Sequence, residues 1–270
     1  MTEFVKNLFG ALESKPKIVF PEGDNPAIIR ATEVASEFIE PILLNGEDAL
    51  IQAAEMVANG EADSMVAGID YTSRDVILAA RDHIGATGKT FSSSFIIDLP
   101  DGRVVALADC ATCKNPTAEQ LADIIIQTVD ETYHPVFADE PRIACLSFST
   151  HNSGGHDASI DKIHETITLV RTKRPELMID GEMQLDAAID PVVGKKKAPR
   201  SPVAGRANVL ILPDLNSGNI LYKSMEQFGR GHAYGPILQG FKAPVSDLSR
   251  GSTLEDVLGV IAITAARLKN

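Results

Sequence analysis

Residues 247–256, with the sequence DLSRGSTLED, combine the side chains that chemistry on an anionic substrate requires. Ser249 and Arg250 stand directly before a segment typical of a helix start, and the carboxylate of Asp256 follows shortly after it. Free N–H groups at a helix start attract anions, and an arginine can bind two phosphate oxygens at once. The segment therefore predicts a place where an anion and a base lie side by side.

The same segment also has a purely structural interpretation. Residues Ser252 to Glu255, S-T-L-E, match a capping box, and the apolar residues that follow recur with helical spacing. Glu255 and Asp256 would then favour the helix dipole, while Arg250 pairs with one of them at the surface. On the residues alone, this structural interpretation is the more common of the two.

Two other polar turns follow strand-like runs. Residues 148–156, FSTHNSGGH, come after RIACL, and residues 213–223, PDLNSGNILYK, come after ANVLIL. Ligands of open α/β sheets bind at the carboxyl ends of strands, so both turns are candidate binding loops. His151 and His156 are equally well explained as solvated loop histidines.

Short β-branched runs alternate with helical stretches along the chain, which predicts mostly parallel sheets with flanking helices. Residues 92–110 interrupt this alternation with two extended runs joined by Pro-Asp-Gly, which is typical of a hairpin and suggests a second domain. We expect a two-domain α/β protein. The first domain would contain residues 1–86 and 236–270, and the second residues 87–235.

Composition narrows the classes of protein. With 270 residues and 44% hydrophobic content, the chain can bury one large core or two ordinary ones. It shows neither a membrane-spanning apolar run nor the apolar core of a signal peptide, so we expect a cytoplasmic protein without a membrane partner. The net charge of -12 argues against a nucleic acid partner.

Two smaller features point to no separate function. The basic tract 194–206 is predicted to be a solvated loop, with a patch for an anionic small molecule as the alternative. The odd number of cysteines, three, argues against a disulfide framework. Cys110 and Cys113 form a lone C-x-x-C without the further ligands that zinc requires or the strand-to-helix context of a redox motif.

Seven stretches, in order along nearly the whole chain, resemble the phosphate acetyltransferase and phosphate butyryltransferase family, and are closer to the acetyl branch. The stretches are KIVFPEGDNP, DSMVAG, ATGKTFSSSF, DGEMQLDAAI, SPVAGRANVLILPDLNSGNILYK, YGPILQG and DLSRGSTLED. The resemblance implies two α/β domains like those of isocitrate and isopropylmalate dehydrogenases, assembled as a homodimer. It also implies reversible acyl transfer between coenzyme A and phosphate, with coenzyme A as a substrate, no cofactor and no metal.

The resemblance assigns roles to single residues. Asp256 accepts the proton of the coenzyme A thiol, Arg250 holds phosphate and developing negative charge, and Ser249 hydrogen-bonds the reacting centre. The candidate substrate-binding residues are Ser73, Arg74, Ser149, Thr150, Asn216, Ser217, Gly218, Asn219, Tyr222 and Gln239. Because an aspartate in water has a pKa of about 3.9 and a thiol one of about 8.5, this proton transfer is uphill by roughly 6 kcal/mol. Positive charge and exclusion of water must reduce that difference.

The chain departs from the family pattern at two places. Between PILLNGEDAL and DSMVAG it is shorter than typical members by a segment that contributes an arginine, and Leu78 stands where a second family arginine is expected. Arg74 or Arg81, one turn away on either side, could compensate. Loss of both arginines would favour a noncatalytic acyl-CoA-binding module, whereas the presence of Ser249, Arg250 and Asp256 together favours catalysis. A third alternative, an NAD-dependent decarboxylating dehydrogenase, has neither a nicotinamide fingerprint nor a carboxylate cluster to support it.

Overall fold

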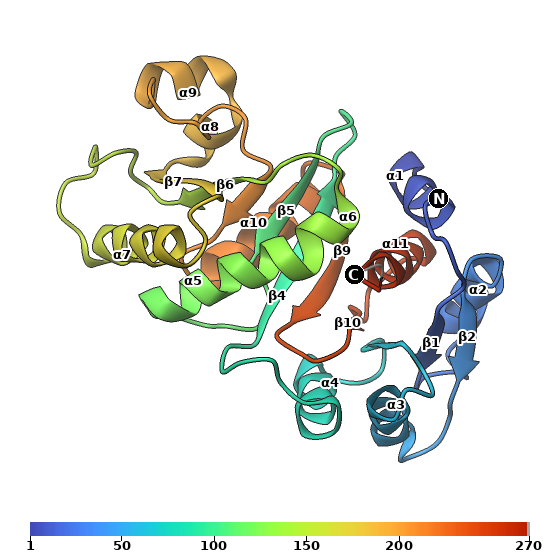
Figure 1. Ribbon diagram of the computed structural model, residues 1–270. Helices are drawn as coiled ribbons and strands as arrows, with labels where there is room; N and C mark the ends of the chain where they lie inside the picture. Colours follow the sequence, from blue (N-terminus) through green and yellow to red (C-terminus); the bar gives the residue numbers. More distant parts are fainter. Residues whose placement is uncertain (269–270) are drawn as a thin grey trace. The chain divides into compact units, whose positions relative to one another are not determined.

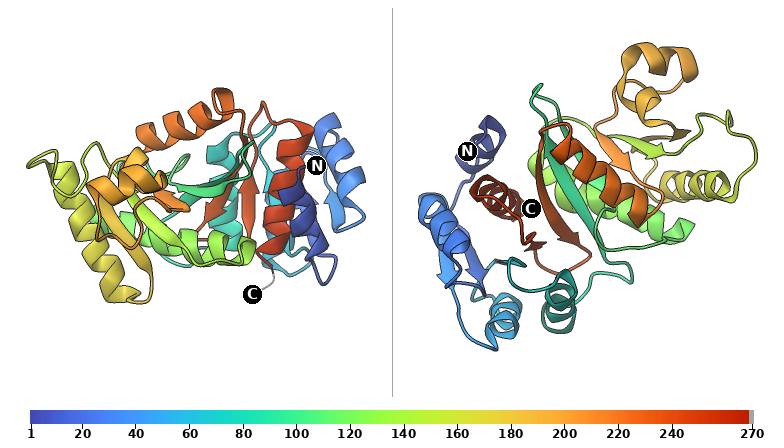
Figure 2. Two further views of the ribbon diagram at one scale, coloured as in Figure 1. Left: turned by 90° about the horizontal axis from the view of Figure 1, so that it is seen from above. Right: turned by 180° about the vertical axis from the view of Figure 1, so that it is seen from behind.

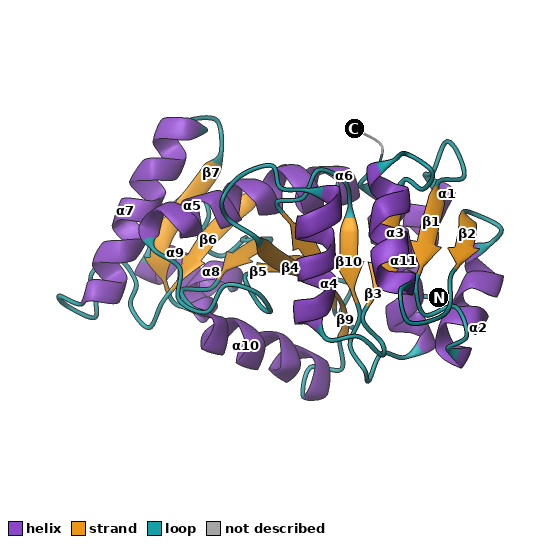
Figure 3. Ribbon diagram, turned by 90° about the horizontal axis from the view of Figure 1, so that it is seen from below, coloured by secondary structure: helices purple, strands orange, loops and turns teal. Residues whose placement is uncertain are grey.

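The computed structural model describes residues 1–268 and separates them into two compact units (Figure 1). Within the described residues, unit 1 is formed by 1–91 and 232–268, and unit 2 by Ser92–Gly231. Unit 1 is therefore built from both ends of the sequence. Figure 3 shows that helices flank the strands in each unit.

The strands of unit 1 lie in the order β2-β1-β3-β10-β9. They are β1 (Lys17–Phe20), β2 (Glu40–Leu43), β3 (Ser64–Ala67), β9 (His232–Gln239) and β10 (Val245–Asp247). The pairs β1·β2, β1·β3 and β3·β10 are parallel, and β9 runs antiparallel to β10. Because β1, β3 and β10 point the same way, the loops that follow them meet at one edge of the sheet.

Helices cover the strands of unit 1. They are α1 (Glu3–Gly10), α2 (Pro26–Ala35), α3 (Ala49–Ala58), α4 (Ser73–Ala79) and α11 (Leu254–Ala266), with α4 continuing as the π-helical segment η1 (Ala80–Ile84). Every residue of α11 from Val257 to Ala266 is buried, since the helix packs against α1, α2, β3 and β9. A helix that is apolar on all sides is held rigidly by such surroundings, so its N-terminus is a fixed point for a site.

Unit 2 has the strand order β4-β5-β8-β6-β7, with β4 and β5 as an antiparallel hairpin and the other pairs parallel. Figure 2 shows α5 and α10 on opposite faces of these strands. The strands are β4 (Ser92–Asp98), β5 (Val104–Ala108), β6 (Arg142–Leu146), β7 (Met178–Met183) and β8 (Val209–Ile211). The helical segments are α5 (Ala118–Gln127), η2 (Thr128–Tyr133), α6 (His134–Val136), α7 (Ala158–Lys173), α8 (Leu185–Ile189), α9 (Pro191–Lys197) and α10 (Leu215–Gln227).

The predicted α/β class and the mostly parallel pairing are confirmed, and so is the hairpin. Two details were wrong. The sequence analysis ended the strands at β9, but the short strand β10 follows it, because hydrogen bonding to β3 and β9 makes a strand of only three residues. The basic tract was expected to be a loop, but its first residues complete α9, where Pro191 occupies the first turn and Asp190 caps the N-terminus.

No helix within residues 1–268 combines the length and the apolar character that crossing a membrane requires.

Gly68, directly after β3, is essential to the close packing of β3 and β10. Its φ is +110°, and a Cβ built there would lie 1.9 Å from Oδ1 of Asp247 and 2.7 Å from the backbone nitrogen of Leu248. A side chain at this position would therefore have to displace the end of β10. Only glycine satisfies both the backbone conformation and the space.

We expect Gly68→Ala to lower the free energy of unfolding by about 2–4 kcal/mol, since it combines left-handed backbone strain with overpacking. Gly46→Ala is the matched control, because Gly46 has a similar φ of +105° but no atom within 4 Å of a built Cβ. It should cost only about 1 kcal/mol. Urea denaturation of both variants measures the difference, and equal losses would show that the contact with Asp247 is unimportant.

Candidate active site

The carboxyl edge of unit 1 is organised by Glu22, which follows β1. Its side chain is buried and accepts backbone N–H groups from Gly68 (2.9 Å), Asp70 (2.6 Å) and Tyr71 (3.0 Å). Three bonds to one carboxylate fix the loop between β3 and α4 onto the end of β1. The N-terminus of α4 thereby takes a defined position at this edge.

Asp247, the last residue of β10, holds the start of α4 from the other side. Its Oδ2 accepts a short hydrogen bond from the hydroxyl of Ser73. The side chain is 0% exposed, and its Oδ1 has no hydrogen-bond partner among residues 1–268. Burial is the main cause that raises the pKa of Asp247 to about 7; the charge of Glu22 adds to this effect, while the Ser73 hydroxyl and the Leu248 N–H oppose it.

The predicted anion-binding residues follow Asp247 in a tight turn. The N–H of Ser249 donates to the hydroxyl of Ser252 (3.1 Å), and the N–H of Ser252 donates to the carbonyl of Ser249 (2.9 Å). The side chains of Ser249 and Arg250 are exposed. The guanidinium of Arg250 has no ion-pair partner among the described residues, so it is free to bind an anion.

The helix α11 begins one residue later than the sequence suggested. The capping box was expected between Ser252 and Glu255, but Thr253 is the N-cap and Asp256 occupies the third helical position. The reason is the tertiary contact of Glu255, which accepts the N–H of Thr2 (2.7 Å) and pairs with the Met1 ammonium (2.8 Å). That carboxylate is therefore unavailable for capping.

Asp256 uses only one oxygen for the cap. Oδ2 accepts the N–H (2.8 Å) and the hydroxyl (2.7 Å) of Thr253. Oδ1 lies 3.9 Å from Nδ1 of His232, the first residue of β9. The cap thus fixes the orientation of the carboxylate, and Oδ1 remains accessible as a proton acceptor.

The two arginines that could replace the missing family arginines differ in their surroundings. Arg81 binds both oxygens of its neighbour Asp82 at the surface (2.7 and 3.0 Å). Arg74, in the first turn of α4, is exposed and has no ion-pair partner within residues 1–268. The bond from Ser73 to Asp247 places Arg74 at the same edge as the turn that carries Arg250. Arg74 is therefore the better candidate of the two.

Gln239, the last residue of β9, is the remaining candidate in unit 1, and it is fully buried. The other candidates belong to unit 2, where Ser149 and Thr150 lie in one loop and the rest lie in α10. Ser149 is buried, donates to Oε1 of Glu182 (2.7 Å) and accepts the N–H of Gly154 (2.9 Å). The hydroxyl of Thr150 accepts the N–H of Gln184 (3.0 Å). These hydroxyls hold their own loop together, and substrate binding by them stays a prediction.

Glu182, buried at the end of β7, is the centre of that loop. It accepts the Ser149 hydroxyl, the N–H of Asn152 (2.7 Å) and a contact from Nε2 of His164 (2.7 Å). Burial acts to raise the pKa of Glu182, but the hydrogen bonds outweigh it and the net pKa is lowered. Glu182 is thus an ionised anchor for residues 149–154.

The second loop of unit 2 leads into α10. Its N-cap is Asp214, which accepts the N–H of Ser217 (2.9 Å), so the remaining candidates lie within the helix. They are Asn216, Ser217, Gly218, Asn219 and Tyr222. Packing explains the glycine at position 218, because a Cβ there would lie 2.2 Å from the carbonyl oxygen of Asp109. Tyr222 stacks on Phe95, with ring centroids 4.1 Å apart. Their contribution to substrate binding stays a prediction.

The cysteine pair lies beside the buried carboxylate of Asp109. Burial and the charge of Asp109 raise the pKa of Cys110 and Cys113, with Lys162 opposing this effect only at Cys113. Both thiols are therefore poorer nucleophiles than free cysteine. Among the described residues, no three His, Cys, Asp or Glu side chains are grouped so that they could hold a metal ion.

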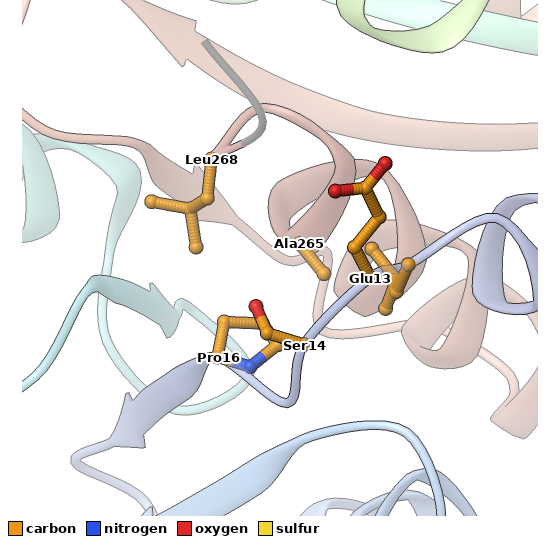
Figure 4. Close-up of a pocket in the computed structure, with 6 residues that line it drawn as sticks. Glu13, Ser14, Pro16, Ala265 and Leu268 are labelled. Carbon is orange, nitrogen blue, oxygen red and sulfur yellow. The ribbon is translucent and has the colours of Figure 1, made fainter.

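Two of the pockets formed by the described residues lie away from these groups. One of about 300 Å³ is lined by Glu13, Ser14, Pro16, Ala265 and Leu268, among others (Figure 4). It adjoins the C-terminus of α11, which is about 20 Å from the N-terminus of that helix at ~1.5 Å per residue. The other, of about 380 Å³, is an apolar depression of unit 2 beside α10, where Phe148 and Ile220 are exposed. Neither pocket contains Ser249, Arg250 or Asp256.

Three residues of this site were not predicted from the sequence. Glu22 and Asp247 lie within quoted motifs but were given no role, and His232 was not considered. Asp247 could have been found from its position before Ser249, at the end of a polar strand. The proximity of His232 to Asp256 arises only from the packing of β9 against α11 and has no sequence signal.

Comparison with known proteins gives these arrangements a context. A phosphate acetyltransferase from Treponema pallidum is 43% identical over 226 residues, which cover 80% of this chain and 67% of that protein. One from Nitrosomonas europaea is 42% identical over 271 residues, covering 95% of this chain. This chain spans only 38% of that relative's length.

Similar solved structures point to the same family as the similar sequences do. A phosphotransacetylase from Streptococcus pyogenes superimposes with a TM-score of 0.89 at 32% identity, covering 99% of both chains. A 4-hydroxythreonine-4-phosphate dehydrogenase from Klebsiella pneumoniae, at 12% identity, a TM-score of 0.56 and coverage of 95% of this chain and 100% of that one, shows a likeness of fold alone. The family model described as "Phosphate acetyl/butaryl transferase" matches residues 39–265. Since this match takes in most of unit 1, all of unit 2 and the residues of the turn before α11, the chain belongs to the phosphate acetyl- and butyryltransferase family.

Proposed function

We propose that this protein transfers an acetyl group reversibly between coenzyme A and phosphate, as its similarity to phosphate acetyltransferases suggests. The observation that carries the proposal is the bond between Ser73 and Asp247. It joins the start of α4, where Arg74 is exposed, to the strand end that leads into the turn with the exposed Arg250. That turn leads directly into α11, whose first turn carries Asp256. Two cations and a base suit an anionic substrate with a thiol to deprotonate.

The reaction follows from these groups. Oδ1 of Asp256 takes the proton of the coenzyme A thiol, and the sulfur attacks the carbonyl carbon of acetyl phosphate. A carbon–sulfur bond forms, the carbon–oxygen bond to phosphate breaks, and phosphate leaves with the electron pair. Arg250 and the N-terminus of α11 stabilise the negative charge that passes from sulfur to the carbonyl oxygen and phosphate. Direct transfer requires no protein nucleophile, because both substrates are held together.

Three further features belong to the same proposal. The fold is related to that of the isocitrate and isopropylmalate dehydrogenases, which the likeness to the Klebsiella pneumoniae dehydrogenase supports. The protein acts as a homodimer, which the family resemblance supports. Coenzyme A is a substrate, and neither a cofactor nor a metal takes part, because the arginines supply the positive charge that a metal would provide.

The proposed base is tested with Asp256→Asn. Asparagine keeps an oxygen for the Thr253 cap but cannot accept the thiol proton, so we expect kcat to fall at least about 100-fold. The measurement is thioester absorbance after acetyl phosphate and coenzyme A are mixed. Glu33→Gln, which alters an exposed carboxylate on α2, should change kcat less than about twofold. A wild-type protein that binds coenzyme A but forms no thioester from any short acyl phosphate would instead be a binding module.

The role of Arg74 is tested against Arg81. We expect Arg74→Ala to raise the KM of a phosphate-bearing substrate about tenfold, since it removes a free guanidinium from the edge of the site. Arg81→Ala should change this KM less than about twofold, because that guanidinium is already paired with Asp82. Steady-state kinetics with coenzyme A and acetyl phosphate varied separately measures both values. A larger rise in KM for Arg81→Ala than for Arg74→Ala would show that Arg81, not Arg74, binds the phosphate-bearing substrate.

A further inference from the structure

Asp247 is a buried acid that the proposed acyl transfer does not use. Its carboxyl group contacts the Ser73 hydroxyl through Oδ2, while Oδ1 is buried against Gly68 and finds no hydrogen-bond partner in the described part of the chain. A buried carboxylate with one oxygen unpaired is unfavourable when it is charged and much less so when it is neutral. The contact with Ser73 survives protonation, since a hydroxyl can either donate or accept.

The charges around Asp247 favour the neutral form further. Glu22, from the loop after β1, contributes a negative charge. On the α4 side, Ser73 is uncharged and Arg74 follows it with an exposed guanidinium, and in the turn after β10 the guanidinium of Arg250 is also exposed. The two arginines therefore face solvent. The two acids Glu22 and Asp247, in contrast, are both buried at the edge of the sheet and lie close to each other.

Building on the proposed function, we propose that Asp247 is a positioning residue that clamps the start of α4 to the Ser249–Arg250 turn in its protonated form, and that anion binding and this protonation favour each other. When Asp247 loses its proton, a second negative charge arises behind the two arginines. That charge weakens their attraction for an anion, whereas the hydrogen bond donated by Ser73 persists in both forms of the acid. The proton that is gained or lost exchanges with solvent, and no other group changes.

The direction of the pH effect follows from the pKa of Asp247, which is raised to about 7. Below this pH the acid is neutral and anions bind well, whereas above it the carboxylate repels them. By linkage, binding of an anion near pH 7 must take up a fraction of a proton. The same acid destabilises the folded state as the pH rises from its unfolded pKa toward about 7, since the unfolded chain ionises first.

The experiment uses sulfate as the probe, because sulfate keeps one charge state between pH 5.5 and 8.5, unlike phosphate. Calorimetric titration of the full chain should show sulfate binding about fivefold weaker at pH 8.5 than at pH 5.5, as expected for one added charge in partly solvated surroundings. In Asp247→Asn this ratio should fall below about twofold. Repeating the titration near pH 7 in buffers of different ionisation enthalpy should show proton uptake in the wild type and less in the variant.

Asp63→Asn is the matched control. Asp63 stands before β3, at the opposite end of that strand, where it accepts the N–H of Lys17 (2.7 Å). This variant should keep the fivefold ratio. Thermal unfolding provides a readout independent of ligands, since the Tm of Asp247→Asn relative to wild type should rise between pH 5 and pH 8.

Two results would overturn the inference. One is an unchanged pH dependence of sulfate binding in Asp247→Asn, and the other is a wild type that binds no sulfate at any of these pH values. Both are distinct from failure of the acyl transfer itself, which the thioester assay reports. A wild type that shows the expected sulfate linkage but no turnover would retain the role of Asp247 and lose the proposed reaction.

Discussion

The hydrogen bond between the Ser73 hydroxyl and the Asp247 carboxylate is the contact on which the arrangement of unit 1 depends. It requires that Asp247 be buried at the end of β10, and the space for that carboxylate exists only because residue 68 is glycine. Glu22 completes the arrangement by holding the loop that leads to α4. A few buried polar contacts thus determine where two exposed arginines stand.

The apolar helix α11 holds the proposed base, Asp256, in a fixed position. The core residues of α11 are buried on all sides, whereas its first turn carries the only groups that the reaction uses there. This division of labour is physically reasonable, because a base held by a cap on an immobile helix loses little entropy on reaching its reactive position. Unit 2 contributes loops of the same construction, with Glu182 in the place that Glu22 occupies in unit 1.

The fold class could be predicted because apolar residues that recur regularly over a long segment distinguish a helix from a strand. Examples are α11 and the β1–α2 and β3–α4 pairs. The sequence could not predict features that depend on one competing contact. Ser252 and Thr253 are equally good caps, and the tie of Glu255 to the start of α1 decides between them. Similarly, Arg74 and Arg81 are alike in sequence, and only the proximity of Asp82 distinguishes them. Asp247 was missed because β10 is too short to show any periodicity.

The position of β10 between β3 and β9 has a consequence for synthesis on the ribosome. The first segment of unit 1 leaves the exit tunnel long before β10 is synthesised, and β3 meanwhile presents an open edge. Unit 2, being continuous in sequence, can complete itself in the interval. The groups assigned to proton transfer and anion binding therefore come together last. If the ribosome stalls before residue 245, unit 2 of the nascent chain can be folded, but the proposed site in unit 1 cannot form.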